Sequence, residues 1–583
     1  MSISRLLKFG TGGTVSIWGA LGKMKTIAAI SAVLSLSIAG VESLAMAGLV
    51  TLLTAGTGAA QISSGLTDHI ANAPAVLALG LISLALNAVQ TWVRERVTGD
   101  WELQLRLELI DAFRRADYST QANYPAGRLS VDGENIASGG NTIGGIIGLI
   151  GFASRTFVYG IVSVVASWQV AGIAVMCGSV LVFLLRMISR RTRKLNDRVA
   201  LLYRDVTEDI VDLAPTAREL HALNRWSTMI ERITEQLREI RLTRFTARAL
   251  AAMVGPAYAT GTLVIGAAVA EWARGGSDQS TTRLAVSGLL LIRCLGSAQS
   301  TQVGFQSVND SLPYMDRGIA AIEDLRARAR VTDSIEHSPD AADEPRLEVF
   351  QASISYGNDT VVRDLTLSLG GRGGVALIGP SGAGKSTTLL ALSGLLRPDT
   401  GLVLCDGADM ADLDLSQVTD TIGYLPQDPR LIRATLRDNL VRWPQDPTDD
   451  DLTARLDRVG LMATVNGFDG GLDATMGRSA EGLSGGELQR LGLVRLLLAK
   501  PRIMLLDEPT SALDRLNADR VASEIAAAME DHLVILVTHR PDLLLHCSEL
   551  IYMEAGSIVD RGTLSDLAER NRFVAAMARE LEV

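Results

Sequence analysis

The hydrophobic positions of the chain divide it into two unlike halves. The first half holds six long apolar runs, each near the roughly 20 residues that a helix needs to cross a bilayer. These runs are Thr26–Leu53, Ile70–Val93, Thr142–Ser167, Val170–Leu185, Ala251–Ala270 and Leu284–Val303. Buried helices of a large soluble protein are the alternative interpretation, but six such runs in one half of a chain favour membrane-spanning helices.

Basic residues are unevenly distributed between these runs. The segments after the second and fourth runs are rich in arginine, whereas the segment after the first run has neither arginine nor lysine. Since basic segments stay in the cytoplasm, both termini are expected on the cytoplasmic side of the membrane. The two basic segments are long, and Trp101–Ala116 and Asp197–Thr243 show the 3.6-residue period of helices that continue below the bilayer.

Composition narrows the class of protein further. The chain has 583 residues, a hydrophobic share of 47% and a formal net charge of −10, so nucleic acid is not expected as a partner. Its mean hydropathy is +0.22. The four cysteines, Cys177, Cys294, Cys405 and Cys547, are scattered and indicate neither a disulfide framework nor a zinc site. Arginine outnumbers lysine, which is typical of a GC-rich bacterial genome.

The pattern changes after the last apolar run. Thr332–Pro345 is polar and acidic, as in a linker, and from Arg346 short apolar strands alternate with glycine-rich turns and amphipathic helices. We therefore expect an α-helical polytopic membrane domain at 1–330, a linker at 331–345 and an α/β domain of the P-loop NTPase class at 346–583.

A phosphate-binding loop follows the strand at 375–378. The sequence G-x-x-x-x-G-K-S stands between a strand and a helix, where glycines let backbone amides wrap phosphate groups. Lys385 is expected on the β- and γ-phosphates of ATP, and Ser386 on Mg²⁺. The expected nucleotide-binding residues here are Gly379, Pro380, Ser381, Gly382, Ala383, Gly384, Lys385, Ser386 and Thr387.

A second apolar strand, at 503–506, ends in two carboxylates. Asp507 is expected to hold Mg²⁺ through water, and Glu508 to polarise the attacking water as general base. Two acids after a strand are also found in ordinary solvated turns, so this role depends on the neighbouring phosphate loop.

Further motifs give the chain a specific resemblance. Leu483-Ser484-Gly485-Gly486-Glu487 is similar to the signature sequence of ABC transporter ATPases. In the same family order, the other motif residues are Tyr356 as the adenine-stacking aromatic, Gln427 of the Q-loop, Asp514 of the D-loop and His539 as the switch histidine.

The resemblance implies an exporter-type half-transporter whose motif residues have known roles. Gln427, Glu508 and His539 would act in catalysis, with Gln427 also near Mg²⁺. Ser484, Gly485 and Gly486 of one subunit would meet ATP bound by another. Because one chain holds one phosphate loop and one signature, the resemblance implies a dimer, and the intact motif set favours a homodimer over a heterodimer.

The family's coupling helices, which rest on the cassettes, are expected near Tyr124–Leu129 and Pro215–Ala222. Two departures from the family pattern stand out. Gly477–Glu481 replaces a family Gly-Glu-Arg-Gly stretch, so that contact is not carried over. Glu487 replaces the commoner glutamine, a change expected to be harmless.

Three charged residues interrupt the apolar runs and bear on the cargo. Glu42, Arg155 and Arg293 lie in the first, third and sixth runs, all roughly 14–18 Å from the outer ends by helical rise. Charges at such depth face a cavity or each other. Either Glu42 pairs with one arginine and merely fixes packing, or an arginine without a carboxylate binds an anionic cargo.

Transport of an amphipathic small molecule, peptide or lipid out of the cytoplasm is the leading expectation. An importer on the same fold, with siderophore-like cargo, and an ATP-gated regulator or channel without transport are the alternatives. No peptidase precedes the first run, which argues against variants that cleave a leader peptide during export.

Overall fold

The computed structural model of the chain describes residues 17–54, 72–125, 127–213, 216–274, 281–329, 344–357, 359–413, 415–442, 445, 447–477 and 482–579. The chain divides into two compact units. The first comprises Met1–Ala116 and Asn123–Ala329, and the second comprises Asp117–Ala122 and Arg330–Val583. Residues 331–343 of the predicted linker lie outside the described part.

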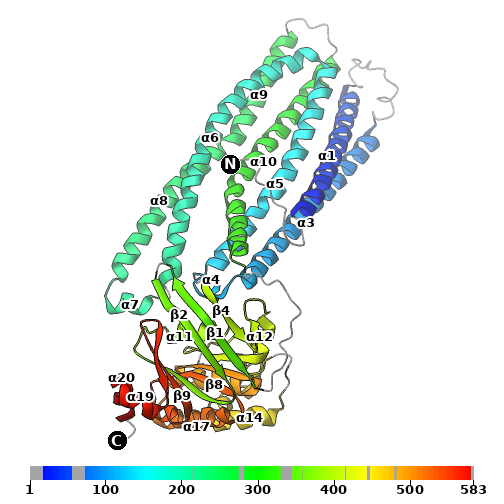
Figure 1. Cartoon of the computed structure of the whole chain (residues 1–583). Coiled ribbons are helices and arrows are strands. Elements are labelled where there is room, and N and C mark those ends of the chain that lie inside the picture. The colour runs from blue at the N-terminus through cyan, green and yellow to red at the C-terminus, as the bar shows by residue number, and fades with distance from the viewer. Residues whose placement is uncertain are drawn as a thin grey trace. The chain divides into compact units, whose positions relative to one another are not determined.

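The first unit is built from long helices that run side by side (Figure 1). They are α1 (Ile17–Thr54), α3 (Ala73–Arg115), α5 (Arg128–Ala166), α6 (Trp168–Leu213), α8 (Trp226–Ala252), α9 (Val254–Arg274) and α10 (Thr281–Ala327), with the short α7 (Ala217–Ala222) before α8. The helical periodicity read from the sequence is therefore correct for this unit.

Close packing of α5 against α10 depends on small residues. A Cβ on Gly139 would lie 2.7 Å from the Cα of Met315, and a Cβ on Gly318 would lie 2.7 Å from Cγ1 of Ile136. Glycine at these positions lets the two backbones approach, as is usual for helices that pack within a membrane.

Four stretches of the described residues are long and apolar enough to cross a membrane. They are Ala29–Val50, Ala73–Arg115, Arg128–Val165 and Trp226–Ala268. These stretches contain the first, third and fifth predicted runs at least in large part, and the described portion of the second. The fourth and sixth predicted runs lie within α6 and α10.

The stretch Asp197–Thr243 is mostly helical, as expected, but it is interrupted. The helix α6 ends at Leu213, and α8 begins only at Trp226. Asn224 adopts a positive φ of 50°, a left-handed conformation that asparagine tolerates and that cannot continue a helix. The short α7 occupies the stretch predicted as the second coupling region, whose Pro215 lies outside the described residues.

The short helix after α3 also comes earlier than predicted. It is α4 (Tyr118–Ala122) and not Tyr124–Leu129, where Gly127 at a φ of 83° instead starts α5. A left-handed glycine interrupts regular helix, which the sequence interpretation did not take into account. Residues 117–122 group with the second unit, although the helices on both sides of α4 belong to the first.

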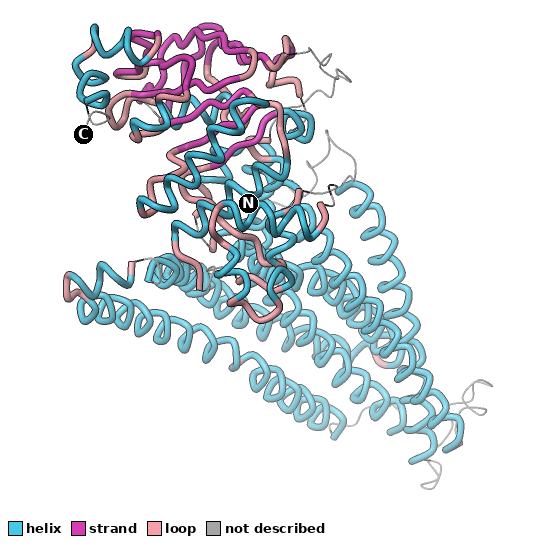
Figure 2. The backbone as a smooth tube through the Cα atoms, turned by 90° about the horizontal axis from the view of Figure 1, so that it is seen from below, coloured by secondary structure: helices cyan, strands magenta, loops and turns pink. Residues whose placement is uncertain are grey.

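Strands occur only in the second unit among the described residues (Figure 2). A four-stranded antiparallel sheet has the order β2-β1-β4-β5, and a six-stranded sheet has the order β10-β9-β3-β8-β7-β6. The strands are β1 (Arg346–Tyr356), β2 (Asp359–Gly370), β3 (Gly373–Ile378), β4 (Thr400–Cys405), β5 (Ala408–Asp409), β6 (Ile422–Leu425), β7 (Ile503–Asp507), β8 (Leu533–Val537), β9 (Cys547–Glu554) and β10 (Ser557–Gly562).

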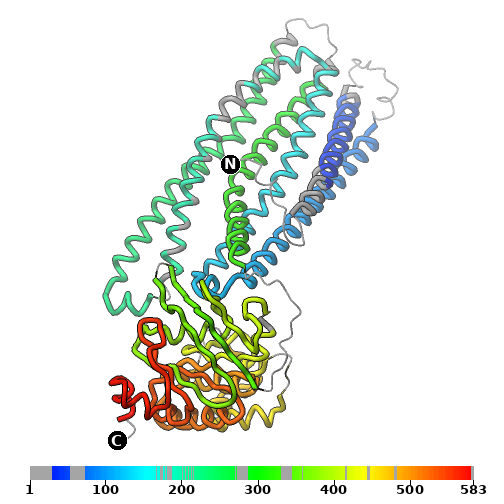
Figure 3. Tube along the Cα trace, in the orientation of Figure 1, coloured from blue at the N-terminus to red at the C-terminus, as the bar shows by residue number. Residues whose placement is uncertain are grey.

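Helices surround these two sheets in the order that Figure 3 traces along the chain. They are α11 (Lys385–Leu392), α12 (Leu415–Thr421), α13 (Leu436–Leu440), α14 (Asp449–Arg458), α15 (Met462–Asn466), the 3₁₀ turn η2 (Gly471–Asp473), α16 (Gly485–Ala499), α17 (Arg515–Asp531), α18 (Pro541–Leu544), α19 (Leu564–Arg570) and α20 (Arg572–Arg579). The alternation of strands and helices agrees with the α/β fold expected from the sequence.

The central strands of the larger sheet are buried on both faces. Every residue of β7 and β8 is buried, in keeping with the apolar sequence of β8 and of β7 up to Leu506. One hydrophobic cluster packs α16 and α17 on this sheet, and a second joins it to the antiparallel sheet. This buried platform fixes where the strands end, and the candidate site lies at those ends.

Candidate functional site

Four neighbouring strands deliver the predicted motifs to one edge of the larger sheet. β3, β8, β7 and β6 are parallel in that spatial order, so their carboxyl ends lie together. The phosphate loop follows β3, His539 follows β8, Glu508 follows β7 and Gln427 follows β6. The carboxyl edge of a parallel sheet is where such folds bind ligands.

Glycine is required in the phosphate loop at both of its ends. Gly379 has a φ of 147°, and a Cβ there would lie 2.1 Å from the carbonyl oxygen of Met553. Gly384 has a φ of 92° and caps α11, and a Cβ there would lie 2.9 Å from the carbonyl oxygen of Val361. The loop therefore keeps a tight turn that leads into the N-terminus of α11, a geometry suited to anions.

Lys385 is held at the centre of this loop. Its Nζ donates hydrogen bonds of 2.8 Å to the carbonyl oxygens of Gly379 and Pro380, and the residue is only 7% exposed. Burial lowers the pKa of Lys385, while the carboxylates of Glu508 and Asp507 partly oppose that effect. A phosphate group would add the negative charge that favours a protonated lysine at this depth.

Ser386 and Asp507 form a donor set that fits Mg²⁺. The Ser386 hydroxyl donates to Oδ1 of Asp507 at 3.1 Å, which brings together two oxygens from different elements. Burial raises the pKa of Asp507, and the nearby Glu508 carboxylate adds to the effect. A divalent cation would favour the ionised carboxylate, and hydroxyl and carboxylate oxygens are ligands that Mg²⁺ accepts.

Glu508 lies between the other two predicted catalytic residues. Gln427 donates from Nε2 to Oε2 of Glu508 at 2.9 Å, and Nε2 of His539 lies 3.7 Å from Oε1. Glu508 itself has a positive φ of 46°, which is uncommon for a residue with a long side chain. Backbone strain of this kind occurs at functional sites, and here it accompanies a carboxylate that two side chains orient.

The sequence interpretation missed a residue that joins these loops, Gln489 on α16. Its Nε2 donates to the carbonyl oxygen of Gln427 at 3.1 Å and to the hydroxyl of Ser511 at 2.9 Å, with a longer contact of 3.4 Å to the carbonyl oxygen of Glu508. Its Oε1 accepts the Ala512 N–H at 3.1 Å.

One signal in the sequence could have identified Gln489. It lies on the same helical stripe as Leu493 and Leu496, four and seven residues further on, and all three side chains are buried. A glutamine on an otherwise apolar stripe must satisfy its amide inside the protein. In α16 that requirement is met by the loops that carry Gln427, Glu508 and Ser511.

Five other predicted residues make no hydrogen bond to the phosphate loop within the described part of the chain. Ser484 caps α16, and its side-chain hydrogen bonds among the described residues go to Glu487, while Gly485 and Gly486 form the first turn of that helix. Tyr356 ends β1 in the antiparallel sheet and is 42% exposed. Asp514 caps α17 by accepting the Asn517 N–H at 3.1 Å.

In the first unit, Glu42 is the centre of one polar cluster. Tyr159 donates its hydroxyl to Oε2 of Glu42 at 2.6 Å, and Ser83 donates to Oε1 at 2.9 Å. Arg293 lies 3.7 Å from the same carboxylate, so of the two arginines that the sequence offered to Glu42 the structure pairs it with Arg293. The four residues come from α1, α3, α5 and α10.

Arg155 belongs to a different cluster. It donates to the side-chain oxygen of Gln90, whose amide in turn donates to Ser35 at 2.6 Å and to Ser31 at 3.1 Å. Gly151 leaves room for this arrangement, since a Cβ there would lie 2.6 Å from Nε2 of Gln90. Among the described residues no carboxylate lies within ion-pair distance of Arg155, and its buried Nε has no hydrogen-bond partner.

Comparison with protein families matches both halves of the chain. Residues 26–270 match the family described as ABC transporter transmembrane region, and residues 362–511 match the family described as ABC transporter. A solved bacterial Atm1-family ABC exporter with ATP bound is similar with a TM-score of 0.78, over 96% of this chain and 99% of that one, at 20% identity. The fold is therefore that of an exporter-type ABC protein.

Curated relatives differ in the transport that their names describe. The β-(1→2)glucan export ATP-binding/permease protein NdvA of Rhodopseudomonas palustris is 32% identical over 42% of this chain and 42% of its own length. The mycobactin import ATP-binding/permease protein IrtB of Mycolicibacterium thermoresistibile is 32% identical over 40% and 41% of the two lengths. The glutathione/L-cysteine transport protein CydC of Bacillus subtilis is 34% identical over 38% and 39%. The aligned stretch thus spans about two fifths of each relative.

The position of Gln489 leads to a first prediction. Gln489→Leu removes the amide that joins the loops of Gln427, Glu508 and Ser511. We expect the rate of ATP hydrolysis at saturating ATP to fall by roughly 10- to 100-fold, because small displacements of catalytic groups have effects of that order.

Gln445→Leu is the matched control, since exposed Gln445 makes its hydrogen bond to the carbonyl oxygen of Ala499, at the far end of the same helix. Steady-state hydrolysis by both variants checks the prediction. A Gln489→Leu protein that turns over like the control would show that the catalytic loops do not depend on this amide.

Proposed function

Because this chain belongs to the ABC transporter family, with transmembrane region and ATP-binding cassette in one polypeptide, we propose that it is an ATP-hydrolysing half-transporter of the cytoplasmic membrane. It exports an amphipathic small molecule, peptide or lipid by alternating access, with the ATPase unit in the cytoplasm. The observation that carries the proposal is the meeting of Gln427, Glu508 and His539 beside the phosphate loop.

Glu508 is the general base of the proposed reaction. Its Oε2 accepts from Gln427 and its Oε1 faces His539, so the carboxylate is oriented before substrate arrives. In this position it polarises the water that attacks the γ-phosphate, while Lys385 and the loop amides stabilise the phosphate charge. Mg²⁺, held by Ser386 and Asp507, supplies further neutralisation of that charge when bound.

The active assembly is a dimer of two copies. Each chain carries one phosphate loop and one signature serine, and Ser484 makes no hydrogen bond to the phosphate loop among the described residues. A second copy supplies the missing half of each site through closed two-fold symmetry. Tyr356 stacks on adenine in this assembly, and Asp514 lies at the subunit boundary.

Movement passes between the units through the short helices. α4 groups with the ATPase unit although α3 and α5 belong to the other, which supports a role as a coupling helix. Closure of the cassettes then shifts the membrane domain between two packed arrangements.

Import is the second candidate function, and one observation favours it. The relative IrtB is named a mycobactin importer and is as similar to this chain as NdvA is. ATP-dependent accumulation inside inverted membrane vesicles indicates export, whereas ATP-dependent loss of preloaded cargo from them indicates import. ATP hydrolysis without any flux would support the regulator or channel alternative.

Arg155 is the candidate contact for the cargo. Glu42 compensates Arg293, whereas the hydrogen-bond partner of Arg155 among the described residues is the neutral amide of Gln90. A guanidinium in a membrane domain that has no ion-pair partner among the described residues favours an anionic group close to it. We assign Arg155 to an anionic group of the cargo, and Glu42 and Arg293 to the packing of the helices that line the route.

The proposed general base gives the next prediction. Glu508→Gln should bind MgATP and close its cassettes but hydrolyse ATP about 10²–10⁴-fold more slowly, because the amide cannot accept the proton of water. Hydrolysis and nucleotide retention measured in nanodiscs check this. Turnover near that of the unchanged protein would exclude Glu508 from catalysis.

Site sharing gives a separate prediction. Lys385→Ala and Ser484→Ala subunits, each inactive as homodimers, should recover part of the ATPase activity when mixed. In the mixed dimer both defects fall in one site and the other site is intact. Absence of recovery in mixed dimers proven by two affinity tags would contradict independent, shared sites.

The cargo assignment predicts unequal effects of two arginines. Arg155→Ala should raise the concentration of an anionic amphiphile that half-maximally stimulates ATP hydrolysis by about tenfold or more, since hydrogen bonds to charged groups contribute about 1.5–3 kcal/mol. Arg293→Lys, which keeps a cation beside Glu42, should change it little.

Dodecyl phosphate paired with dodecanol, and an N-acyl amino acid paired with its methyl ester, are suitable probes. Basal hydrolysis reports folding of each variant. If Arg155→Ala and the unchanged protein respond equally to the anionic member of each pair, Arg155 is a packing residue only.

A further inference from the structure

The hydroxyl of Ser484, the serine of the signature sequence, already donates a hydrogen bond within its own chain. The Ser484 hydroxyl donates to Oε2 of Glu487 at 2.8 Å, and the Ser484 backbone N–H donates to the same oxygen at 2.7 Å. In return the Glu487 backbone N–H donates to the Ser484 hydroxyl oxygen at 3.3 Å. The two residues form a capping box at the N-terminus of α16.

The Glu487 carboxylate is held firmly in this position. Its second oxygen, Oε1, accepts the hydroxyl of Thr464 at 2.6 Å, so both oxygens have donors. Burial raises the pKa of Glu487, but the hydrogen bonds from Thr464 and Ser484 outweigh burial and leave it below its ordinary value. The carboxylate is therefore ionised at neutral pH, and its negative charge lies at the start of the helix.

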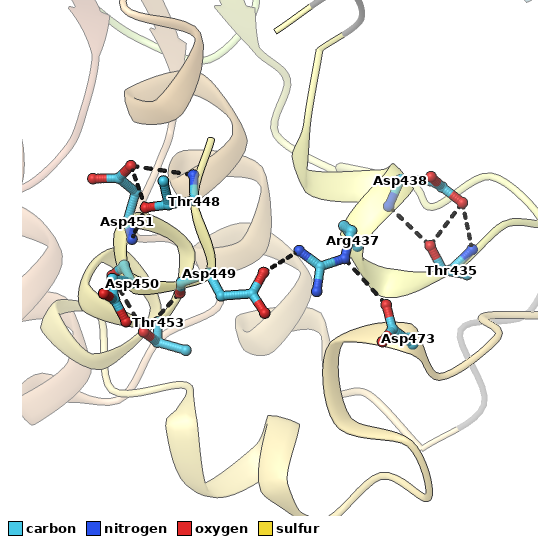
Figure 4. Close-up of polar contacts among 9 residues, drawn as sticks. All are labelled: Thr435, Arg437, Asp438, Thr448, Asp449, Asp450, Asp451, Thr453 and Asp473. Atoms are coloured by element: carbon cyan, nitrogen blue, oxygen red, sulfur yellow. Dashed lines mark hydrogen bonds and ion pairs between the residues drawn. The ribbon is translucent and has the colours of Figure 1, made fainter. Parts of the chain in front are cut away.

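Three other helices in the same unit begin with a capping box of the same kind. Thr435 with Asp438, Thr448 with Asp451, and Thr563 with Asp566 each repeat it, with hydroxyl-to-carboxylate distances of 2.7 Å. Figure 4 shows the first two of them. A capping box by itself thus contributes only to helix stability.

Ser484 differs from the other three capping residues because the proposed function gives its hydroxyl a second role. Under the proposed function its hydroxyl meets the terminal phosphate of ATP bound by the partner copy. A hydroxyl has one proton, and a phosphate oxygen accepts but does not donate. While the Ser484 hydroxyl donates its proton in the hydrogen bond to Glu487, the hydroxyl oxygen faces the phosphate with lone pairs only.

We infer that Glu487 is a positioning residue that competes with the terminal phosphate of ATP for the Ser484 hydroxyl and so restrains closure of the two cassettes. The inference rests on the proposed function, and it replaces the expectation that glutamate at this position is harmless. Closure requires the hydroxyl to turn from the carboxylate to the phosphate.

Glu487→Gln tests this directly. A glutamine whose amide oxygen takes the place of Oε2 still accepts both the Ser484 N–H and the Ser484 hydroxyl, while its NH₂ group donates to the Thr464 hydroxyl oxygen. Because this acceptor is neutral, it gives up the hydroxyl to a phosphate more readily than the carboxylate does. We expect the ATP concentration for half-maximal cassette closure to fall by roughly three- to tenfold, because charged acceptors hold a proton about twice as strongly as neutral ones.

The experiment uses the full chain in nanodiscs in the Glu508→Gln background, so that closure is read without turnover. Energy transfer between fluorophores on the two cassettes reports closure as MgATP is added. Asp451→Asn is the matched control, because it makes the equivalent change in the Thr448 box away from the proposed phosphate contact. Thermal unfolding of both variants separates helix stability from nucleotide response.

A third variant identifies the shared hydroxyl. In a Ser484→Ala background the gain from Glu487→Gln should disappear, since no proton is left to compete for. An unchanged ATP response in Glu487→Gln, an equal gain in Asp451→Asn, or a gain that persists without the Ser484 hydroxyl would each overturn the inference. Failure of the proposed function itself is distinct: the Glu508→Gln protein would then show no ATP-dependent closure at any concentration.

Discussion

Parallel pairing of β3, β8, β7 and β6 is the constraint on which the candidate site depends. Residues paired along these strands lie in register, with Leu377 opposite Val537, and Asp507 opposite the same valine from the other side. The loops that follow the strands therefore start at one level. Helices on its faces bury the apolar residues of this sheet, and the polar loops are left at its carboxyl edge.

At that edge the catalytic groups are fixed by hydrogen bonds between loops that are far apart in sequence. Gln427 and His539 contact the Glu508 carboxylate and orient it. Gln489 donates to the backbone carbonyl oxygens of Gln427 and Glu508, and so links the two loops that carry them. A movement of α16 relative to the sheet is thus transmitted to Gln427 and Glu508 together. Because Ser484 begins this helix and Gln489 lies within its second turn, one rigid element carries both the signature and the amide that organises the catalytic loops.

In the first unit, charged side chains lie on apolar helices and need polar partners there. Glu42 and Arg293 compensate each other, with hydroxyls of Tyr159 and Ser83 completing the carboxylate's hydrogen bonds. Within the described part of the chain, the Arg155 guanidinium donates to the neutral amide of Gln90, and its Nε has no hydrogen-bond partner. Glycines such as Gly139 and Gly151 allow both the close packing of helices and the placement of these polar clusters.

The sequence alone determined the division into a helical membrane domain and an α/β domain, because apolar runs of membrane length and the phosphate loop are local patterns that need no partner. It also identified Lys385, Asp507, Glu508 and His539, since their chemistry follows from motifs in fixed order. Three-dimensional packing was needed to show which arginine Glu42 compensates, and that Gln489 joins the loop of Gln427 to the loop of Glu508 and Ser511. These contacts link residues tens to hundreds of positions apart. The interruption of Asp197–Thr243 and the place of α4 likewise depended on local backbone conformations at Asn224 and Gly127, which helical periodicity does not encode.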